Sequence, residues 1–165
     1  MIIEGSVVLL TGANGGIGRA FVKTLLDRRA AKIYLGVRNP ASVQDLIASS
    51  DRLAAVELDL ARPEQIAATA KTATDITLLI NNAGLAAFTG VLSASDTTGA
   101  RTEMEVNYFG VLALSQALRD TRHFARAEPS STFSRFSHIS RCPSLERTRR
   151  RKRRHCISPG PCGPN

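Results

Sequence analysis

Ser6-Val-Val-Leu-Leu-Thr-Gly-Ala-Asn-Gly-Gly-Ile-Gly18 is an apolar run that ends at a glycine-rich turn and continues directly into a helical pattern. Val7 to Leu10 are typical of a strand buried on both faces of a parallel sheet. The three glycines Gly12, Gly16 and Gly18 permit a tight turn, a close approach of the backbone to a pyrophosphate, and close packing of the next helix, expected over residues 19–26. The N-terminus of that helix offers free N–H groups to phosphate. The stretch therefore predicts a strand, a phosphate-binding loop and a helix.

Strand and helix patterns continue to alternate after this first unit. Apolar runs at residues 31–37, 54–58 and 76–80 predict three more strands, and helical patterns are expected over 41–49 and from Pro63. Strands that alternate with helices form right-handed crossovers and a parallel sheet, whose ligands bind at the carboxyl ends of the strands. The sequence therefore predicts the α/β class with a doubly wound parallel sheet.

A loop and a long helix are expected after the fourth strand. Residues 85–99 are small, polar and poorly periodic, which is consistent with a loop over the site. From Arg101 the pattern becomes that of a long amphipathic helix. The residues expected on its apolar face are Met104, Val106, Tyr108, Val111, Leu112, Leu114 and Leu118.

Two motifs resemble those of the short-chain dehydrogenase/reductase family. Thr11 to Gly18 has the Gly-x-x-x-Gly-x-Gly spacing of the family's cofactor loop, and Asn81-Asn-Ala-Gly84 is similar to the motif that follows its fourth strand. The resemblance covers residues 1 to about 125. It implies a Rossmann-like domain that binds a nicotinamide dinucleotide, oxidoreductase activity on a small carbonyl or alcohol substrate, and homo-oligomers among full-length members.

The expected cofactor-binding residues lie in the glycine loop and at the strand ends. Arg38 follows the second strand about 20 residues after the loop, where an arginine accepts a ribose 2′-phosphate, and this favours NADP, with NAD possible. The alternative is a solvated surface arginine. By resemblance Asp59 contacts the adenine ring, unless it only serves the following helix. The whole set is Thr11, Gly12, Asn14, Gly15, Gly16, Ile17, Gly18, Arg38, Asp59, Leu60, Asn82, Ala83 and Gly84.

Asn107 is the candidate catalytic residue. It lies in Glu105-Val-Asn-Tyr-Phe-Gly110 and matches the asparagine that, in the family, holds the water of a proton relay. The alternative is a mid-helix polar group satisfied by its neighbours. In the family a serine, a tyrosine and a lysine complete the mechanism: tyrosine protonates the carbonyl oxygen while hydride leaves the nicotinamide, and lysine lowers the tyrosine's pKa.

The family pattern ends near residue 125. A fifth strand carrying the serine is expected at about residues 129–137, but Ser130 to His138 is not typical of a core strand, and no tyrosine follows Tyr108. The sequence therefore predicts an incomplete sheet of four strands in a domain spanning 1–125, followed by a disordered basic tail over 126–165. Without the Tyr-x-x-x-Lys motif, this chain is expected to be inactive.

The genetic code offers an explanation for the missing motif. Residues 147–154 can be encoded as CGT ACT CGG CGT CGA AAG CGG CG, and reading from the last base of the first codon gives Tyr-Ser-Ala-Ser-Lys-Ala-Ala. The same frame permits a strand ending in serine from the codons of residues 129–135 and a helix from those of 155–165. We therefore hypothesise a frameshift between about residues 122 and 129.

The charge is concentrated in the tail. The net charge is +8, of which residues 141–165, with eight Lys/Arg and one Glu, supply +7. The run from Arg147 to Arg154 leaves a nucleic-acid-binding or nuclear-targeted product as the alternative function, although no aromatic residues are interleaved for base stacking. The three cysteines, at positions 142, 156 and 162, match no zinc or disulfide framework, so no metal is expected. Neither a signal peptide nor a membrane span is expected, and the predicted location is cytoplasmic.

Overall fold

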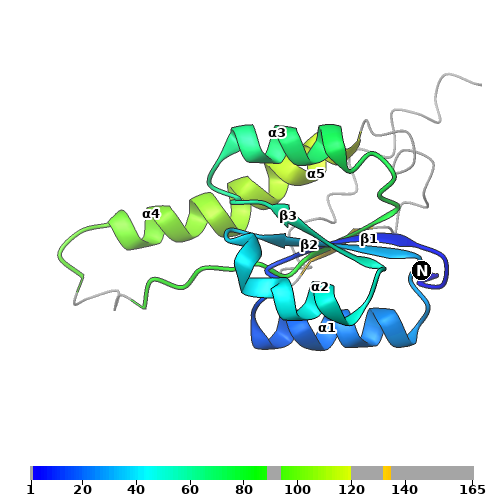
Figure 1. The fold of residues 1–165 in the computed structure, drawn as a ribbon. Coiled ribbons are helices and arrows are strands. Elements are labelled where there is room, and N and C mark those ends of the chain that lie inside the picture. Colours follow the sequence, from blue (N-terminus) through cyan, green and yellow to red (C-terminus); the bar gives the residue numbers. More distant parts are fainter. Residues whose placement is uncertain (1, 89–93, 120–131, 135–165) are drawn as a thin grey trace, which may run out of the picture. The chain divides into compact units, whose positions relative to one another are not determined.

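The computed structural model describes residues 2–88, 94–119 and 132–134, within a compact unit that extends from Met1 to Arg135. Its centre is a parallel sheet with the strand order β3-β2-β1-β4-β5 (Figure 1). The strands are β1 (Val7–Thr11), β2 (Lys32–Val37), β3 (Leu53–Glu57), β4 (Leu78–Asn81) and β5 (Thr132–Ser134). The α/β class and the parallel, Rossmann-like sheet are thus confirmed.

Helices cover both faces of this sheet (Figure 1). On one face lie α1 (Gly16–Asp27), the 3-10 turn η1 (Pro40–Val43) and α2 (Gln44–Ser49), and on the other lie α3 (Pro63–Thr72) and α5 (Val111–Arg119). Successive residues of β1 point to opposite faces, so Val8 and Leu10 join the core beneath α1 while Leu9 joins the core beneath α3 and α5. The strand is buried on both faces, as its apolar run predicts.

Two predicted helices differ in detail from the observed ones. Helix α1 begins at Gly16, inside the glycine loop, instead of at residue 19. The helix expected over 41–49 is divided into η1 and α2, because Asn39 closes a tight turn: its side-chain Oδ1 accepts from the Ala41 amide at 3.0 Å and its carbonyl accepts from the Ser42 amide at 3.0 Å. Such Asx turns compete with a regular helix start.

The long helix also differs from its expected form. It consists of α4 (Thr98–Met104), the π-helical segment η2 (Glu105–Gly110) and α5. Leu114 and Leu118 are buried as expected, but Met104 and Leu112 are about half exposed, so placing these two on the buried face was wrong. Leu112 is two positions from Leu114 and therefore lies nearly opposite it. Met104 precedes the π turn in α4, a helix without a buried residue that projects beyond the sheet (Figure 1).

The structure adds a short fifth strand to the four predicted ones. Thr132 to Ser134 form a short fifth strand, β5, which pairs in parallel with Leu79 to Asn81. A strand edge offers unpaired backbone N–H and C=O groups to any extended segment, and Thr and Phe favour extended backbone. Backbone pairing therefore does not require the apolar run that the prediction looked for.

Several sequence predictions lie outside the described residues. These are the domain boundary near residue 125, the out-of-frame stretch, the basic run from 147 to 154 and the three cysteines. Among the described helices, none combines the length and apolar character needed to cross a membrane. The described residues also contain no group of three or more His, Cys, Asp or Glu side chains placed to hold a metal ion.

Candidate functional site

The glycine turn between β1 and α1 is closed by backbone packed on backbone. Gly12 has a φ of 67°, which favours glycine, and a Cβ built on it would lie 2.8 Å from the Cα of Ala83. A Cβ on Gly18 would lie 2.2 Å from the carbonyl oxygen of Gly12. Around Gly16, by contrast, no atom lies within 4 Å of a built Cβ. Two glycines are thus required by the fold itself, whereas Gly16 faces open space.

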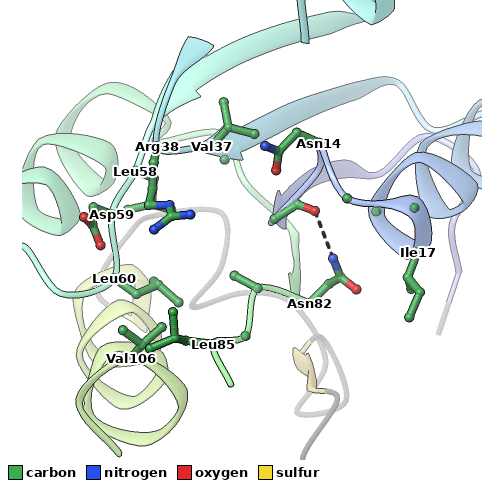
Figure 2. Close-up of a pocket in the computed structure, with 17 residues that line it drawn as sticks. Asn14, Ile17, Val37, Arg38, Leu58, Asp59, Leu60, Asn82, Leu85 and Val106 are labelled. Atoms are coloured by element: carbon green, nitrogen blue, oxygen red, sulfur yellow. Dashed lines mark hydrogen bonds between the residues drawn. The ribbon is translucent and has the colours of Figure 1, made fainter. Parts of the chain in front are cut away.

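Thr11 and Asn82 join the ends of β1 and β4. The Thr11 hydroxyl oxygen accepts from the backbone amides of Asn82 and Ala83, each at 3.0 Å. In return the Asn82 side-chain Nδ2 donates to the carbonyls of Thr11 and Gly12, each at 3.1 Å, and the second of these bonds is drawn in Figure 2. Thr11 and Asn82 are both buried, and this exchange fixes the loop after β4 against the glycine turn.

A pocket of about 300 Å³ opens at this carboxyl end of the sheet (Figure 2). It has the size of a small ligand site. All of the predicted cofactor-binding residues line it except Thr11, which lies beneath it. The pocket-lining residues from the prediction are Gly12, Asn14, Gly15, Gly16, Ile17, Gly18, Arg38, Asp59, Leu60, Asn82, Ala83 and Gly84.

The charged side chains around the pocket differ in whether they have a partner. The Arg38 side chain, at the end of β2, forms no hydrogen bond or ion pair with the residues that the structure describes. Asp59, in contrast, accepts from the Ala61 amide at 3.0 Å and lies 3.9 Å from the Nε of Arg62. The buried Oδ1 of Asn82 also has no hydrogen-bond partner. Among the described residues, the pocket thus presents the uncompensated cation Arg38, and an unpartnered amide oxygen lies buried at its lining.

Asn107 does not line the pocket but holds one of its walls. Its Oδ1 accepts from the Leu85 amide at 2.8 Å, and its Nδ2 donates to the Leu85 carbonyl at 2.7 Å. Leu85 and Val106, which precedes Asn107 in η2, both line the pocket. The Asn107 side chain is therefore satisfied by backbone, as the alternative interpretation expected, and the bonds reach across the site instead of staying within the helix.

A second close approach from η2 fixes another lining residue of the pocket. Gly110, the last residue of η2, lies so near the loop after β3 that a built Cβ would be 2.5 Å from the Leu60 carbonyl oxygen. Leu60 is itself a pocket residue.

Five lining residues were missed by the sequence analysis: Gly36, Val37, Leu58, Leu85 and Val106. Gly36 gave a usable signal, because a glycine within an apolar strand marks a close backbone approach. Here a Cβ on Gly36 would lie 3.3 Å from the Leu10 carbonyl oxygen. The other four are ordinary apolar residues whose position in the pocket depends on the three-dimensional arrangement alone.

A family model described as short chain dehydrogenase matches residues 6–127, well over half of the chain. The chain belongs to this family. Its glycine loop, its four-strand core and Asn107 all lie within the matched part.

Relatives among known short-chain dehydrogenases match the same region. Dehydrogenase/reductase SDR family member 7B of Mus musculus is 35% identical over 128 residues, which cover 70% of this chain and 39% of the mouse protein. A short-chain dehydrogenase from Burkholderia cenocepacia, solved in complex with NADP, is 47% identical with a TM-score of 0.66, covering 72% of this chain and 48% of that one. An NADPH-bound carbonyl reductase from chicken fatty liver is 29% identical, with a TM-score of 0.65 and the same coverage. The chain thus spans less than half the length of these short-chain dehydrogenases.

Proposed function

We propose that this chain binds a nicotinamide dinucleotide in the pocket at the carboxyl end of its sheet, with NADP preferred over NAD. The observation that carries the proposal is the convergence of the glycine turn, the unpaired Arg38 and the loop from Asn82 to Gly84 on one pocket. Two family members of known structure, the Burkholderia cenocepacia enzyme and the chicken carbonyl reductase, were solved with NADP and NADPH. By family, the reaction is hydride transfer between this cofactor and a carbonyl or alcohol.

The pyrophosphate would lie at the N-terminus of α1. No side chain caps this helix, and its first turn contains no acidic residue, so its N–H groups and positive dipole end are available to an anion. The open space around Gly16 lets phosphate oxygens approach these groups. Asn82 lines the same pocket, and its buried Oδ1 is left without a protein partner, which is common at functional sites. The residues present therefore fit a dinucleotide.

Arg38 would select the 2′-phosphate. Its guanidinium points into the pocket (Figure 2), and because it has no partner within residues 2–88, 94–119 and 132–134, its charge is available to a ligand anion. Arginine forms paired hydrogen bonds with a phosphate group, whereas a ribose 2′-hydroxyl carries no charge that would attract the guanidinium. Asp59, on the neighbouring loop, would contact the adenine ring, as the family resemblance implies, and Leu60 beside it lines the same pocket.

Exchange of Arg38 tests this assignment. Arg38→Gln should weaken NADP binding about tenfold to a hundredfold, the range for losing a charged hydrogen bond, and leave NAD binding unchanged. Arg38→Asp should make NAD the tighter ligand. The matched control is Arg62→Gln, because Arg62 is also near the pocket but lies beside Asp59. Titration calorimetry of each variant with both dinucleotides measures these affinities. If NADP and NAD bound equally well to the original protein and to both Arg38 variants, Arg38 would be only a surface charge.

Asn107 would support the relay water of the family mechanism through the segment that it holds. Its contacts to Leu85 keep that loop in place, but residues 1–165 supply no tyrosine after Tyr108 to protonate a carbonyl oxygen. We therefore propose that this chain binds cofactor without turnover. An assay of carbonyl reduction with NADPH measures this directly, and substrate-dependent oxidation of NADPH would contradict it. The frameshift remains a hypothesis that the codons for residues 147–152 would test.

A further inference from the structure

The guanidinium of Arg19, which follows Gly18 in α1, links three segments that are distant in sequence. Its Nε donates to the carbonyl of Asn14 in the glycine turn at 3.3 Å, and its Nη2 donates to the carbonyl of Ser42 in η1 at 3.2 Å. Nη1 and Nη2 also bind the two carboxylate oxygens of Asp45 in α2, at 2.5 and 3.1 Å. The Arg19 hydrogen bond lowers the pKa of the Asp45 carboxyl, so the pair stays charged near neutral pH.

These contacts fix the two segments that carry the phosphate-binding groups of the pocket. Asn14 lines the pocket within the glycine turn. Ser42 lies in η1, and both its amide and its hydroxyl donate to the carbonyl of Asn39, the residue after Arg38, at 3.0 and 2.6 Å. Because this turn is braced internally, an anchor on Ser42 also sets the backbone position of Arg38.

We propose that Arg19 is a positioning residue, which sets the separation between the glycine turn and Arg38 and thereby the preference for a dinucleotide with a 2′-phosphate. This inference rests on the proposed function. Arg19 acts without touching the ligand, because it does not line the pocket and four of its five guanidinium N–H donors are used in bonds to Asn14, Ser42 and Asp45. Arg38, in contrast, has no such bond among the described residues and remains available to the phosphate.

The inference predicts a selective loss of affinity. Arg19→Gln should weaken NADP binding about fivefold, the size expected for a partly exposed bidentate pair, and leave NAD binding unchanged. Once Arg38 has been replaced by Gln, the same change at Arg19 should have no further effect on NADP, because the coupled partner is gone. The matched control is Glu4→Gln, which removes an exposed ion pair with Arg29 and should change neither affinity.

A change at Asp45 separates positioning from direct contact. Asp45→Asn removes the ion pair but leaves the Arg19 charge and its bonds to Asn14 and Ser42, so positioning predicts a loss of NADP affinity that is smaller than that of Arg19→Gln. If Arg19 instead bound the phosphate itself, freeing it from Asp45 would maintain or raise NADP affinity, and that result would overturn the inference. The NADP affinity of Arg19→Lys, which keeps only part of the contact, should lie between that of Arg19→Gln and that of the original protein.

The measurement is calorimetric titration of the full 165-residue chain and its variants with NADP and NAD, combined with urea unfolding of each variant. Equal weakening of both dinucleotides in Arg19→Gln, or no weakening at all, would refute the positioning role and leave the proposed function intact. Failure of the unmodified chain to bind either dinucleotide would instead refute the proposed function, and the inference with it.

Discussion

The two ends of the parallel sheet handle polar groups in opposite ways. At the amino end, Lys32 Nζ donates to the Tyr34 hydroxyl at 2.7 Å, and that hydroxyl donates to Asp75 Oδ1 at 2.8 Å. At the carboxyl end, Asn82 Oδ1 is buried without a partner, as are both polar side-chain atoms of Asn81. An unpaired buried polar group costs about 1–3 kcal/mol. The sheet therefore completes its polar contacts at the end without a pocket and leaves them incomplete at the end that carries one.

Two glycine substitutions test which parts of the carboxyl end are needed for folding and which are needed for binding. Gly18→Ala forces a Cβ against the Gly12 carbonyl and should destabilise the protein by about 3 kcal/mol, as overpacking does at its upper range. Gly16→Ala meets no atom within 4 Å and should change stability by less than about 0.5 kcal/mol. Urea unfolding of the two variants gives both values.

The order of the two variants should differ when NADPH affinity is measured on folded protein: here Gly16→Ala should show the clear loss. Gly16→Ala places a methyl group where the pyrophosphate approaches, so the affinity should fall at least about tenfold despite normal stability. Unchanged NADPH affinity in Gly16→Ala would show that the glycine turn is only a turn.

Thr11 tests how much the link between β1 and β4 contributes. Thr11→Val keeps the shape but leaves the Asn82 and Ala83 amides without an acceptor, and the free energy of unfolding should fall by about 2 kcal/mol. NADPH affinity should fall with it, because the loop after β4 loses its attachment. Thr11→Ser retains the hydroxyl and serves as the control. A Thr11→Val protein as stable as the original would mean that water replaces the hydroxyl.

The amino end should respond in stability alone. Tyr34→Phe removes the central hydroxyl and should lower the free energy of unfolding by about 1 kcal/mol without changing NADPH affinity. In the original protein, the hydrogen bond with Tyr34 raises the pKa of Lys32, and burial raises the pKa of Tyr34. Both groups bind protons more tightly when folded, so their contribution is complete below about pH 10 and is lost as the pH rises through the folded pKa values.

This pH dependence is a separate measurement from the stability at neutral pH. Unfolding in urea between pH 8 and 11 should show a smaller alkaline loss for Tyr34→Phe than for the original protein. If the free energy of unfolding fell equally with pH in both proteins, the cluster of Lys32, Tyr34 and Asp75 would make no pH-dependent contribution to stability.

The sequence predicts best those features whose cause is local. The strand around Leu9 and the glycine turn follow from a few adjacent residues, because burial on both faces and a tight turn each demand particular residue types there. Leu85 and Val106 could not be assigned to the pocket, because their placement depends on Asn107 reaching 22 residues back along the chain. The fifth strand was missed for a related reason: β5 pairs through its backbone, which leaves no mark on the residue pattern.

The contact between Gly110 and Leu60 determines how far the pocket can adapt. There the backbone of Gly110 lies directly against that of Leu60, so the two segments cannot move closer together. Leu85, by contrast, is attached to η2 by two hydrogen bonds from the Asn107 side-chain amide and can shift without unpacking a helix. We therefore expect any change in the width of the pocket to come from movement of the Leu85 loop, while the Leu60 backbone stays in place.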